Sequence, residues 1–254
     1  MPDINSFKAL PLTKGTFIAD PFIVRHDRKH FIFFEEYIYA KAKAHISAME
    51  VNAGGIFTNP SVVLNKADHL SYPFVFEWEN MWYMIPETAA NKTVELYRCK
   101  EFPHEWEFVM NLFENIFLID CTLLYHKNKW WLFAATQNHS FTTTNDQLLL
   151  FYSETLFSTD WKPHPQNPIS TDISNCRPAG KIFLKDGKLY RPAQNNASQQ
   201  YGYGLKINRI DVLNETEYSE TTIEEIDPEK NNRLAAVHTL NFTEEITVID
   251  GIIK

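Results

Sequence analysis

Short apolar runs alternate with tight polar turns along the whole chain. Four segments share one layout, in which an apolar strand meets a polar turn and a second, aromatic-rich strand follows. This alternation predicts β-hairpins. The four copies and a weaker fifth begin at Ile18, Ser71, Ile119, Cys176 and Val237. Further strands are predicted between the hairpins, at 43–51, 93–101, 147–155 and 203–211.

The hairpins recur at equivalent positions 48 to 61 residues apart. A repeat of that length, made of strands, is typical of a propeller, whose four-stranded blades bury their faces against their neighbours. No segment carries the pattern of an amphipathic helix, which argues against an α/β transferase fold. The sequence therefore predicts an all-β, five-bladed β-propeller that forms a single domain over residues 1–254.

Composition excludes several classes of partner. The formal net charge is −8, and the lysines and arginines are scattered, so no basic stripe is present to bind nucleic acid. The first ten residues do not read as a signal peptide, and no apolar run is long enough to span a membrane. We therefore expect a cytoplasmic protein.

The three cysteines, Cys99, Cys121 and Cys176, have no zinc-site spacing, and we expect neither a metal nor a cofactor.

Each copy of the repeat carries polar residues where its first strand begins and its second strand ends. Both positions lie at the same edge of a hairpin, so they are expected to surround one mouth of the propeller axis. The predicted inner ring consists of Asp20, Tyr72, Asp120, Arg177 and His238. The predicted second ring contains Glu35 or Glu36, Glu87, Gln137 and Gln194. Each residue alone has an ordinary structural explanation, but five at equivalent positions favour a concave site.

Two further cations of the fourth copy are candidates for the same mouth. Lys181 and Arg191 are expected to support Arg177 in binding an anion, or else to pair with surface acids. The tryptophans of the aromatic-rich strands, such as Trp82 and Trp130, are interpreted mainly as blade core, because they alternate within strands.

The ADPF start, the segment IDCTLLYHKNKWWLFA and the WKPHPQNPI tail before CRPAG resemble a group of five-bladed propellers. The chain resembles the N-terminal domain of plant glucosamine inositolphosphorylceramide transferases and its bacterial relatives, over nearly its whole length. It is more distantly similar to arabinanase-like furanosidases. The resemblance implies carbohydrate chemistry, and bacterial members suggest surface-polysaccharide or glycoconjugate synthesis. By its place in the first copy, Asp20 matches the residue that acts as general base in the furanosidases. Where those hydrolases carry a second Asp, this chain has Tyr72, and where they carry the Glu that acts as general acid, it has Asp120.

These departures favour sugar transfer from a phosphate-activated donor, because a phosphate leaving group needs charge compensation more than a proton donor. In this interpretation Asp20 is the base for a saccharide acceptor, and Asp120 orients Asp20 or Arg177 or stabilises positive charge on the sugar. Arg177 and His238 bind the phosphate of a sugar-phosphate or nucleotide-sugar donor. The alternatives are a furanosidase-like hydrolase with Asp20 as base and Glu87 as acid, a non-catalytic sugar-binding propeller, and a structural or interaction propeller.

Overall fold

The computed structural model describes residues 6–10, 13–52, 54–137, 147–196, 202–228 and 233–254. Its strands form four antiparallel sheets of four strands each, and within each sheet the strands follow one another in chain order. The first sheet contains β1 (Thr16–His26), β2 (Lys29–Ile38), β3 (Lys43–Val51) and β4 (Ser61–Leu64). The second contains β5 (Ser71–Trp78), β6 (Met81–Glu87), β7 (Thr93–Glu101) and β8 (Glu105–Glu114).

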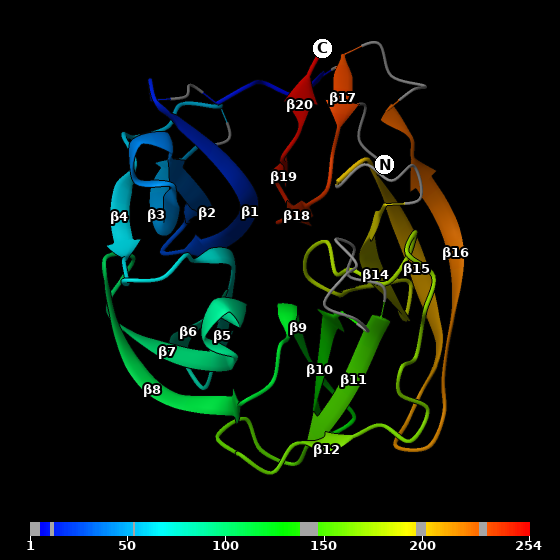
Figure 1. Cartoon of the computed structure of the whole chain (residues 1–254). Coiled ribbons are helices and arrows are strands. Elements are labelled where there is room, and N and C mark those ends of the chain that lie inside the picture. The colour runs from blue at the N-terminus through cyan, green and yellow to red at the C-terminus, as the bar shows by residue number, and fades with distance from the viewer. Residues whose placement is uncertain (1–5, 11–12, 53, 138–146, 197–201, 229–232) are drawn as a thin grey trace.

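The other two sheets repeat this arrangement. The third contains β9 (Ile119–His126), β10 (Lys129–Thr136), β11 (Gln147–Ser153) and β12 (Lys162–Pro163). The fourth contains β13 (Phe183–Lys185), β14 (Lys188–Asn195), β15 (Gly204–Leu213) and β16 (Tyr218–Ile226). Figure 1 shows the sheets set around a common centre, with β1, β5 and β9 innermost and β4, β8, β12 and β16 at the periphery. The prediction of an all-β propeller is therefore confirmed.

Helical structure within the described residues is confined to short 3-10 turns, such as η2 (Tyr39–Lys41) and η3 (Ala89–Asn91). Both lie between the second and third strand of a blade and end on a residue in the left-handed conformation.

Each predicted hairpin turn is a two-residue loop with both residues at positive φ. These pairs are Asp27–Arg28, Glu79–Asn80, Lys127–Asn128 and Asp186–Gly187. Positive φ at both positions defines the type I′ turn, whose twist matches that of the flanking strands. Only the fourth pair is the favoured Asp-Gly, so the other three turns hold side chains in a conformation that glycine would adopt more readily.

Two short hairpins lie between the fourth sheet and the first (Figure 1). They pair β17 (Leu234–Ala236) with β20 (Ile252–Ile253), and β18 (Leu240–Phe242) with β19 (Thr247–Ile249). Val248 packs in the core of the first sheet, and Leu240 packs in the core of the fourth, so the C-terminal segment closes the ring. Four complete blades are thus present. A fifth blade, made of these hairpins, and a single domain over 1–254 stay predictions.

Neighbouring blades are held together by apolar clusters. Trp106 lies with Phe33 in the cluster between the first two sheets, and Trp131 and Phe133 contribute to the one between the third and fourth. The interpretation of the aromatic-rich strands as mainly core is confirmed for Trp131 and Phe133, which are 2% and 0% exposed.

Candidate active site at one mouth of the propeller

A β-bulge recurs at the start of the innermost strand of three blades. The strand register shifts at Asp20, Tyr72 and Asp120, and these residues have φ of 51°, 41° and 53°. Non-glycine residues seldom adopt this left-handed conformation, and bulges often re-aim side chains beside active sites. The equivalent positions that the sequence singled out therefore share an unusual backbone as well as a register.

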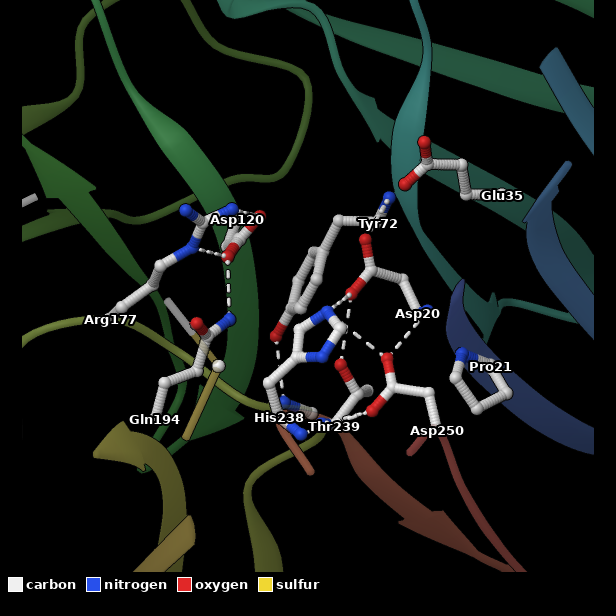
Figure 2. Close-up of polar contacts among 12 residues, drawn as sticks. Asp20, Pro21, Glu35, Tyr72, Asp120, Arg177, Gln194, His238, Thr239 and Asp250 are labelled. Atoms are coloured by element: carbon white, nitrogen blue, oxygen red, sulfur yellow. Dashed lines mark hydrogen bonds and ion pairs between the residues drawn. The ribbon is translucent and has the colours of Figure 1, made fainter. Parts of the chain in front are cut away.

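His238 lies between two buried carboxylates (Figure 2). Its Nε2 is 3.3 Å from Asp20 Oδ1 and 3.1 Å from Asp250 Oδ2. Thr239 donates its hydroxyl to Asp20 Oδ1 at 2.9 Å, and the Asp20 backbone N–H donates to Asp250 Oδ2 at 3.0 Å. Asp250 Oδ1 accepts the backbone N–H groups of His238 and Thr239 at 3.1 and 2.8 Å. We call this arrangement of Asp20, His238, Thr239 and Asp250 the histidine cluster.

The charges of the histidine cluster are coupled. Burial favours the neutral imidazole, but the charges of Asp250 and Asp20 prevail and raise the pKa of His238 to about 9. Burial works against ionisation of Asp20 too, yet His238, together with Arg177 and Thr239, holds the pKa of Asp20 below its ordinary value. At neutral pH the cluster therefore holds an imidazolium against an ionised Asp20.

Arg177 forms a second group of contacts with Asp120 (Figure 2). Its Nε donates to Asp120 Oδ2 at 2.5 Å and its Nη2 to Asp120 Oδ1 at 3.4 Å, and Nη2 lies 4.0 Å from Glu87 Oε2. Gln194 Nε2 donates to Asp120 Oδ2 at 3.3 Å. We call Glu87, Asp120, Arg177 and Gln194 the arginine cluster.

The arginine cluster disfavours the ionised form of Glu87. Burial and the charge of Asp120 raise the pKa of Glu87 well above its ordinary value, although Arg177 opposes the shift, and the Glu87 and Asp120 carboxyl groups share a hydrogen bond. Burial likewise raises the pKa of Asp120 despite Arg177. Glu87 Oε2 and Gln194 Oε1 are buried without a hydrogen-bond partner within the described part of the chain. Such unsatisfied atoms are rare in native structures and are typical of sites that bind a ligand.

In both clusters the cation is more exposed than the carboxylate it pairs with. The Arg177 side chain is 12% exposed against 0% for Asp120, and that of His238 is 15% exposed against 3% for Asp20. Arg177 also lowers the pKa of His238 by direct repulsion, so the two cations lie close enough to interact. Arg177 and His238 thus lie nearer the solvent than Asp120 and Asp20, while the Glu87 side chain, at 18%, is more exposed than that of Arg177.

Tyr72 joins the two clusters from within the core. It is 0% exposed, its backbone N–H donates to Asp20 Oδ2 at 3.3 Å, and its hydroxyl contacts Thr122 Oγ1 and accepts the Gly180 N–H, both at 2.8 Å. The hydroxyl is thus buried and engaged within the protein, and the assignment of Tyr72 as a substrate-binding residue stays a prediction.

Lys181 and Arg191, the two supporting cations of the sequence analysis, do not join either cluster. Lys181 lines a separate pocket, described below. Arg191 is fully buried in the fourth blade, where it donates to Glu220 at 2.6 and 2.9 Å and to the Asn175 carbonyl at 2.8 Å. Its charge is thus neutralised inside the blade, and the expectation that it helps to bind an anion at the mouth was wrong.

The second ring is only partly assembled at the mouth. Glu35 lies near Asp20 (Figure 2), with His69 Nε2 3.3 Å from its carboxylate, and burial together with the Asp20 charge raises the pKa of Glu35. Glu36 binds His45 and Ser47 instead. Gln137 directly follows the end of β10 and is half-buried. Glu35 is therefore the member of the Glu35–Glu36 pair that approaches the histidine cluster.

Sequence reasoning missed Asp250 and Thr239. Asp250 lies outside the repeated hairpin positions, and its only signal was its place in the closing VIDG segment. One ligand atom from each of Asp20, His238 and Asp250 lies within 4.8 Å of the others, a spacing that a cation would fit. The protonated state of His238 disfavours metal binding, because a histidine ligand must be neutral. The expectation of no metal stays a prediction.

No helix among the described residues combines the length and the apolar character needed to cross a membrane.

Comparison with known proteins identifies the relatives of this chain. It is 35% identical over 212 residues to glucosamine inositolphosphorylceramide transferase 1 of Oryza sativa subsp. japonica, and 32% identical over 212 residues to the protein of that name from Arabidopsis thaliana. Each alignment covers 82% of this chain, but only 28% of the rice protein and 27% of the Arabidopsis protein. The chain thus spans less than a third of these relatives.

The fold is similar to that of an exo-1,5-α-L-arabinanase from a bovine ruminal metagenomic library. The TM-score is 0.65 at 14% sequence identity, and the match covers 96% of this chain and 91% of the arabinanase. A family model described as glucosamine inositolphosphorylceramide transferase 1, N-terminal, matches residues 9–244. The chain therefore belongs to the family of the N-terminal domain of glucosamine inositolphosphorylceramide transferase 1.

Proposed function

We propose that the chain transfers a sugar from a phosphate-activated donor to a hydroxyl acceptor, with the donor phosphate bound at the mouth by Arg177 and His238. The observation that carries this proposal is the outward position of these two cations, each in front of a buried carboxylate. The protein as a whole carries a net charge of −8, so an anion gains from a local site in which positive charge faces solvent. A bound phosphate would also relieve the repulsion between the two cations.

Arg177 suits a phosphate because its guanidinium is planar and makes paired hydrogen bonds to two oxygens. Asp120 holds this guanidinium in place through Nε and Nη2, which fixes the direction in which the remaining N–H groups donate. Asp120 is thus proposed as a positioning residue for Arg177.

The sugar itself is proposed to lie against Glu87 and Gln194. Each offers a buried oxygen without a hydrogen-bond partner, and sugar hydroxyl groups would donate to them. Because Glu87 is neutral, it does not repel the phosphate that binds beside it.

Asp20 is proposed as the base. Its lowered pKa keeps it ionised at neutral pH, and among the described residues Oδ2 accepts one hydrogen bond, of 3.3 Å from the Tyr72 N–H, which leaves a lone pair for the acceptor hydroxyl. In the transfer, the acceptor oxygen forms a bond to the anomeric carbon, the bond from that carbon to the phosphate oxygen breaks, and the proton passes to Asp20. The phosphate leaves with the bonding electron pair, stabilised by Arg177 and His238.

A hydrolase remains the second candidate because of one specific observation. Glu87 is a neutral carboxyl group and Asp20 an ionised one at the same mouth, and a pair of carboxyl groups held in different protonation states is typical of glycoside hydrolysis. A hydrolase would release free sugar from a neutral glycoside, with Glu87 protonating the leaving group.

The test is incubation of the protein with a panel of nucleotide sugars and sugar 1-phosphates, with and without glycosides and glycolipids as acceptors. The proposal expects release of phosphate or nucleotide that depends on the acceptor, together with a new glycoside. Free sugar released from neutral glycosides would support the hydrolase instead. Binding of donors without any turnover would indicate a non-catalytic propeller that acts with a separate transferase.

Matched variants sharpen this test. Arg177→Met should weaken donor binding, whereas Arg209→Met should not, because Arg209 is an arginine of the same blade that pairs with Asp211 outside the clusters. Asp20→Asn removes the proposed base and should lower turnover roughly 10²–10⁴-fold at unchanged donor affinity. Equal donor affinity in the two arginine variants would contradict the phosphate site.

The biological setting is proposed from the sequence analysis. We infer a role in bacterial surface-polysaccharide or glycoconjugate synthesis, and a cytoplasmic location, as the sequence predicted. The identity of the relatives favours an acceptor that carries a sugar or an inositol phosphate headgroup.

A further inference from the structure

A second pocket lies at the opposite end of the axis from the two clusters. Its volume is about 500 Å³, and every copy of the repeat contributes to it through residues three to six positions after the inner-ring residue of that copy. In β1, β5 and β9, at about 3.3 Å per residue, these positions lie roughly 10–20 Å further along the strand than Asp20, Tyr72 and Asp120. No residue of the two clusters lines the pocket, and Phe22, between Asp20 and the pocket residue Ile23 in the chain, is fully buried with its ring 4.8 Å from that of the buried Tyr72, so the pocket is separate from the mouth.

Aromatic side chains form one wall of this pocket. Trp78 lies 4.7 Å from Tyr125 and 4.8 Å from Trp130, measured between ring centroids, and Phe76 lies 5.9 Å from Trp130. Tyr125 is 43% exposed, so the wall is open to solvent on one side. A wall of this kind fits a flat ligand with an apolar face.

The tryptophans of this wall differ from the others in their hydrogen bonding. The indole N–H groups of Trp82, Trp106, Trp131 and Trp161 each donate to an acceptor at 2.8–3.2 Å. Trp78 and Trp130 are the two remaining tryptophans, and neither indole N–H has an acceptor among the residues that the structure describes. Because indole N–H groups in proteins usually find a partner, these two are available to a polar ligand.

Lys181 supplies a cation to the same pocket. Its side chain is half-buried, it forms no ion pair with a carboxylate in the described part of the chain, and its Nζ lies 5.9 Å from the ring centroid of Phe74. Burial lowers the pKa of Lys181 to about 8, so the amine remains largely protonated at neutral pH. Glu77 and Arg25 also line the pocket, and Arg25 pairs with Glu245 at 3.8 Å. Lys181 is therefore a cation without a counter-ion beside an aromatic wall.

We propose that this pocket is a second saccharide site, which binds a pyranose carrying an anionic substituent. The C–H face of a pyranose carries partial positive charge and packs on the negative faces of Trp78 and Tyr125. The ring hydroxyl groups accept hydrogen bonds from the two indole N–H groups, and the anionic substituent forms an ion pair with Lys181. The phosphate or carboxylate of the sugar thereby compensates a charge that the protein leaves unpaired.

The experiment titrates the intact protein with four probes: glucose 6-phosphate, glucuronate, methyl α-glucoside and inorganic phosphate. Binding is followed by tryptophan fluorescence and by the indole N–H signals in a ¹⁵N-correlated NMR spectrum. We expect one or both charged sugars to bind at least about tenfold more tightly than methyl α-glucoside, with signals of Trp78 and Trp130 shifting and those of Trp106 and Trp161 unchanged. The tighter of the two charged sugars identifies the acid as phosphate or carboxylate.

Three variants test the assignment. Lys181→Met keeps the aliphatic stem and should weaken the charged sugars by about tenfold or more, whereas Lys185→Met, at an exposed lysine of the same blade, should change nothing. Trp78→Phe keeps an aromatic ring but removes the indole N–H, and should weaken all three sugars. If inorganic phosphate shifts the Trp78 and Trp130 indole signals with the same affinity as glucose 6-phosphate, or if the two lysine variants bind the charged sugars equally, the saccharide site is overturned.

The result is independent of the proposed transfer reaction. Asp20→Asn, at the opposite mouth, should leave binding of these probes unchanged. Signals that shift only around the histidine and arginine clusters would place the charged sugars at the mouth and would contradict the second site.

Discussion

Asp250 is expected to be the residue on which the histidine cluster depends most. All four contacts of its carboxylate are with donors. Oδ1 accepts hydrogen bonds from two backbone N–H groups at 3.1 and 2.8 Å. Oδ2 accepts a hydrogen bond from the Asp20 N–H at 3.0 Å and lies 3.1 Å from His238 Nε2. In Asp250→Asn, one oxygen becomes an NH₂ group that faces two donors. The charge that opposes the imidazolium is lost as well.

Breaking a buried ion pair by removing one partner costs about 3–5 kcal/mol, and the two donors left without an acceptor are part of that cost. We therefore expect Asp250→Asn to lower the free energy of unfolding at pH 7 by about 3–5 kcal/mol, measured by urea denaturation. The charge of Asp250 is also the main cause that raises the pKa of His238, so this pKa should fall from about 9 toward its ordinary value. An NMR titration of the imidazole measures it.

The matched control is Asp211→Asn, since Asp211 pairs with Arg209 at the surface of the fourth blade and should contribute little. If Asp250→Asn unfolds at the same urea concentration as Asp211→Asn, and the pKa of His238 stays near 9, the histidine cluster is not the ion-paired group described above.

Three further outcomes are expected. The folded state raises the pKa of His238 from 6.5 to about 9. The contribution of His238 to the free energy of unfolding should therefore be complete below pH 6.5 and fall by about 3 kcal/mol as the pH rises through 9. The difference between wild type and His238→Gln, measured across this pH range, isolates this loss. Glu87→Gln should be as stable as wild type at pH 7 or more so, since burial and Asp120 raise the pKa of Glu87 well above its ordinary value and disfavour its charge; a large loss in thermal denaturation would show that the carboxylate is needed. Arg191→Met should destabilise the fold by about 3–5 kcal/mol, because it leaves Glu220 buried without its partner, but should leave donor binding at the mouth unchanged when measured by calorimetry.

The strands follow closely from the sequence. The segments 43–51 and 93–101 were predicted from apolar alternation, and β3 and β7 have those bounds. The hairpin turns were equally predictable, because each has two polar residues between apolar runs. Local pattern was sufficient here, since each strand pairs with its neighbour in the chain.

The site was less predictable, and the reasons are spatial. Asp20 and His238 were placed together by the repeat, and they do lie 3.3 Å apart. Lys181 was assigned to the same mouth, but it lies four residues after Arg177, before the strand β13 begins and just after Gly180 at a φ of 135°, and it lines the second pocket instead. Arg191 was misassigned because its partner Glu220 lies on another strand, and the sequence does not reveal which acid a buried arginine will meet.

Backbone conformation at the ring was also beyond the sequence. Asp20, which precedes Pro21, has an ordinary explanation in the sequence as a turn initiator, but the structure has Asp20 and Asp120 at positive φ within bulges. Strain of this kind costs about 1–3 kcal/mol and is often retained at functional sites. No pattern of residue types marks such a conformation, because these side chains usually adopt ordinary strand geometry.

The most direct test of the proposed function is a crystal structure of the protein soaked with inorganic pyrophosphate, a probe for the diphosphate of a nucleotide-sugar donor. The proposal predicts the anion at the mouth, with oxygens within hydrogen-bond distance of both Arg177 and His238, and its loss in Arg177→Met crystals. An empty mouth, or an anion bound only beside Lys181 at the opposite end of the axis, would contradict it.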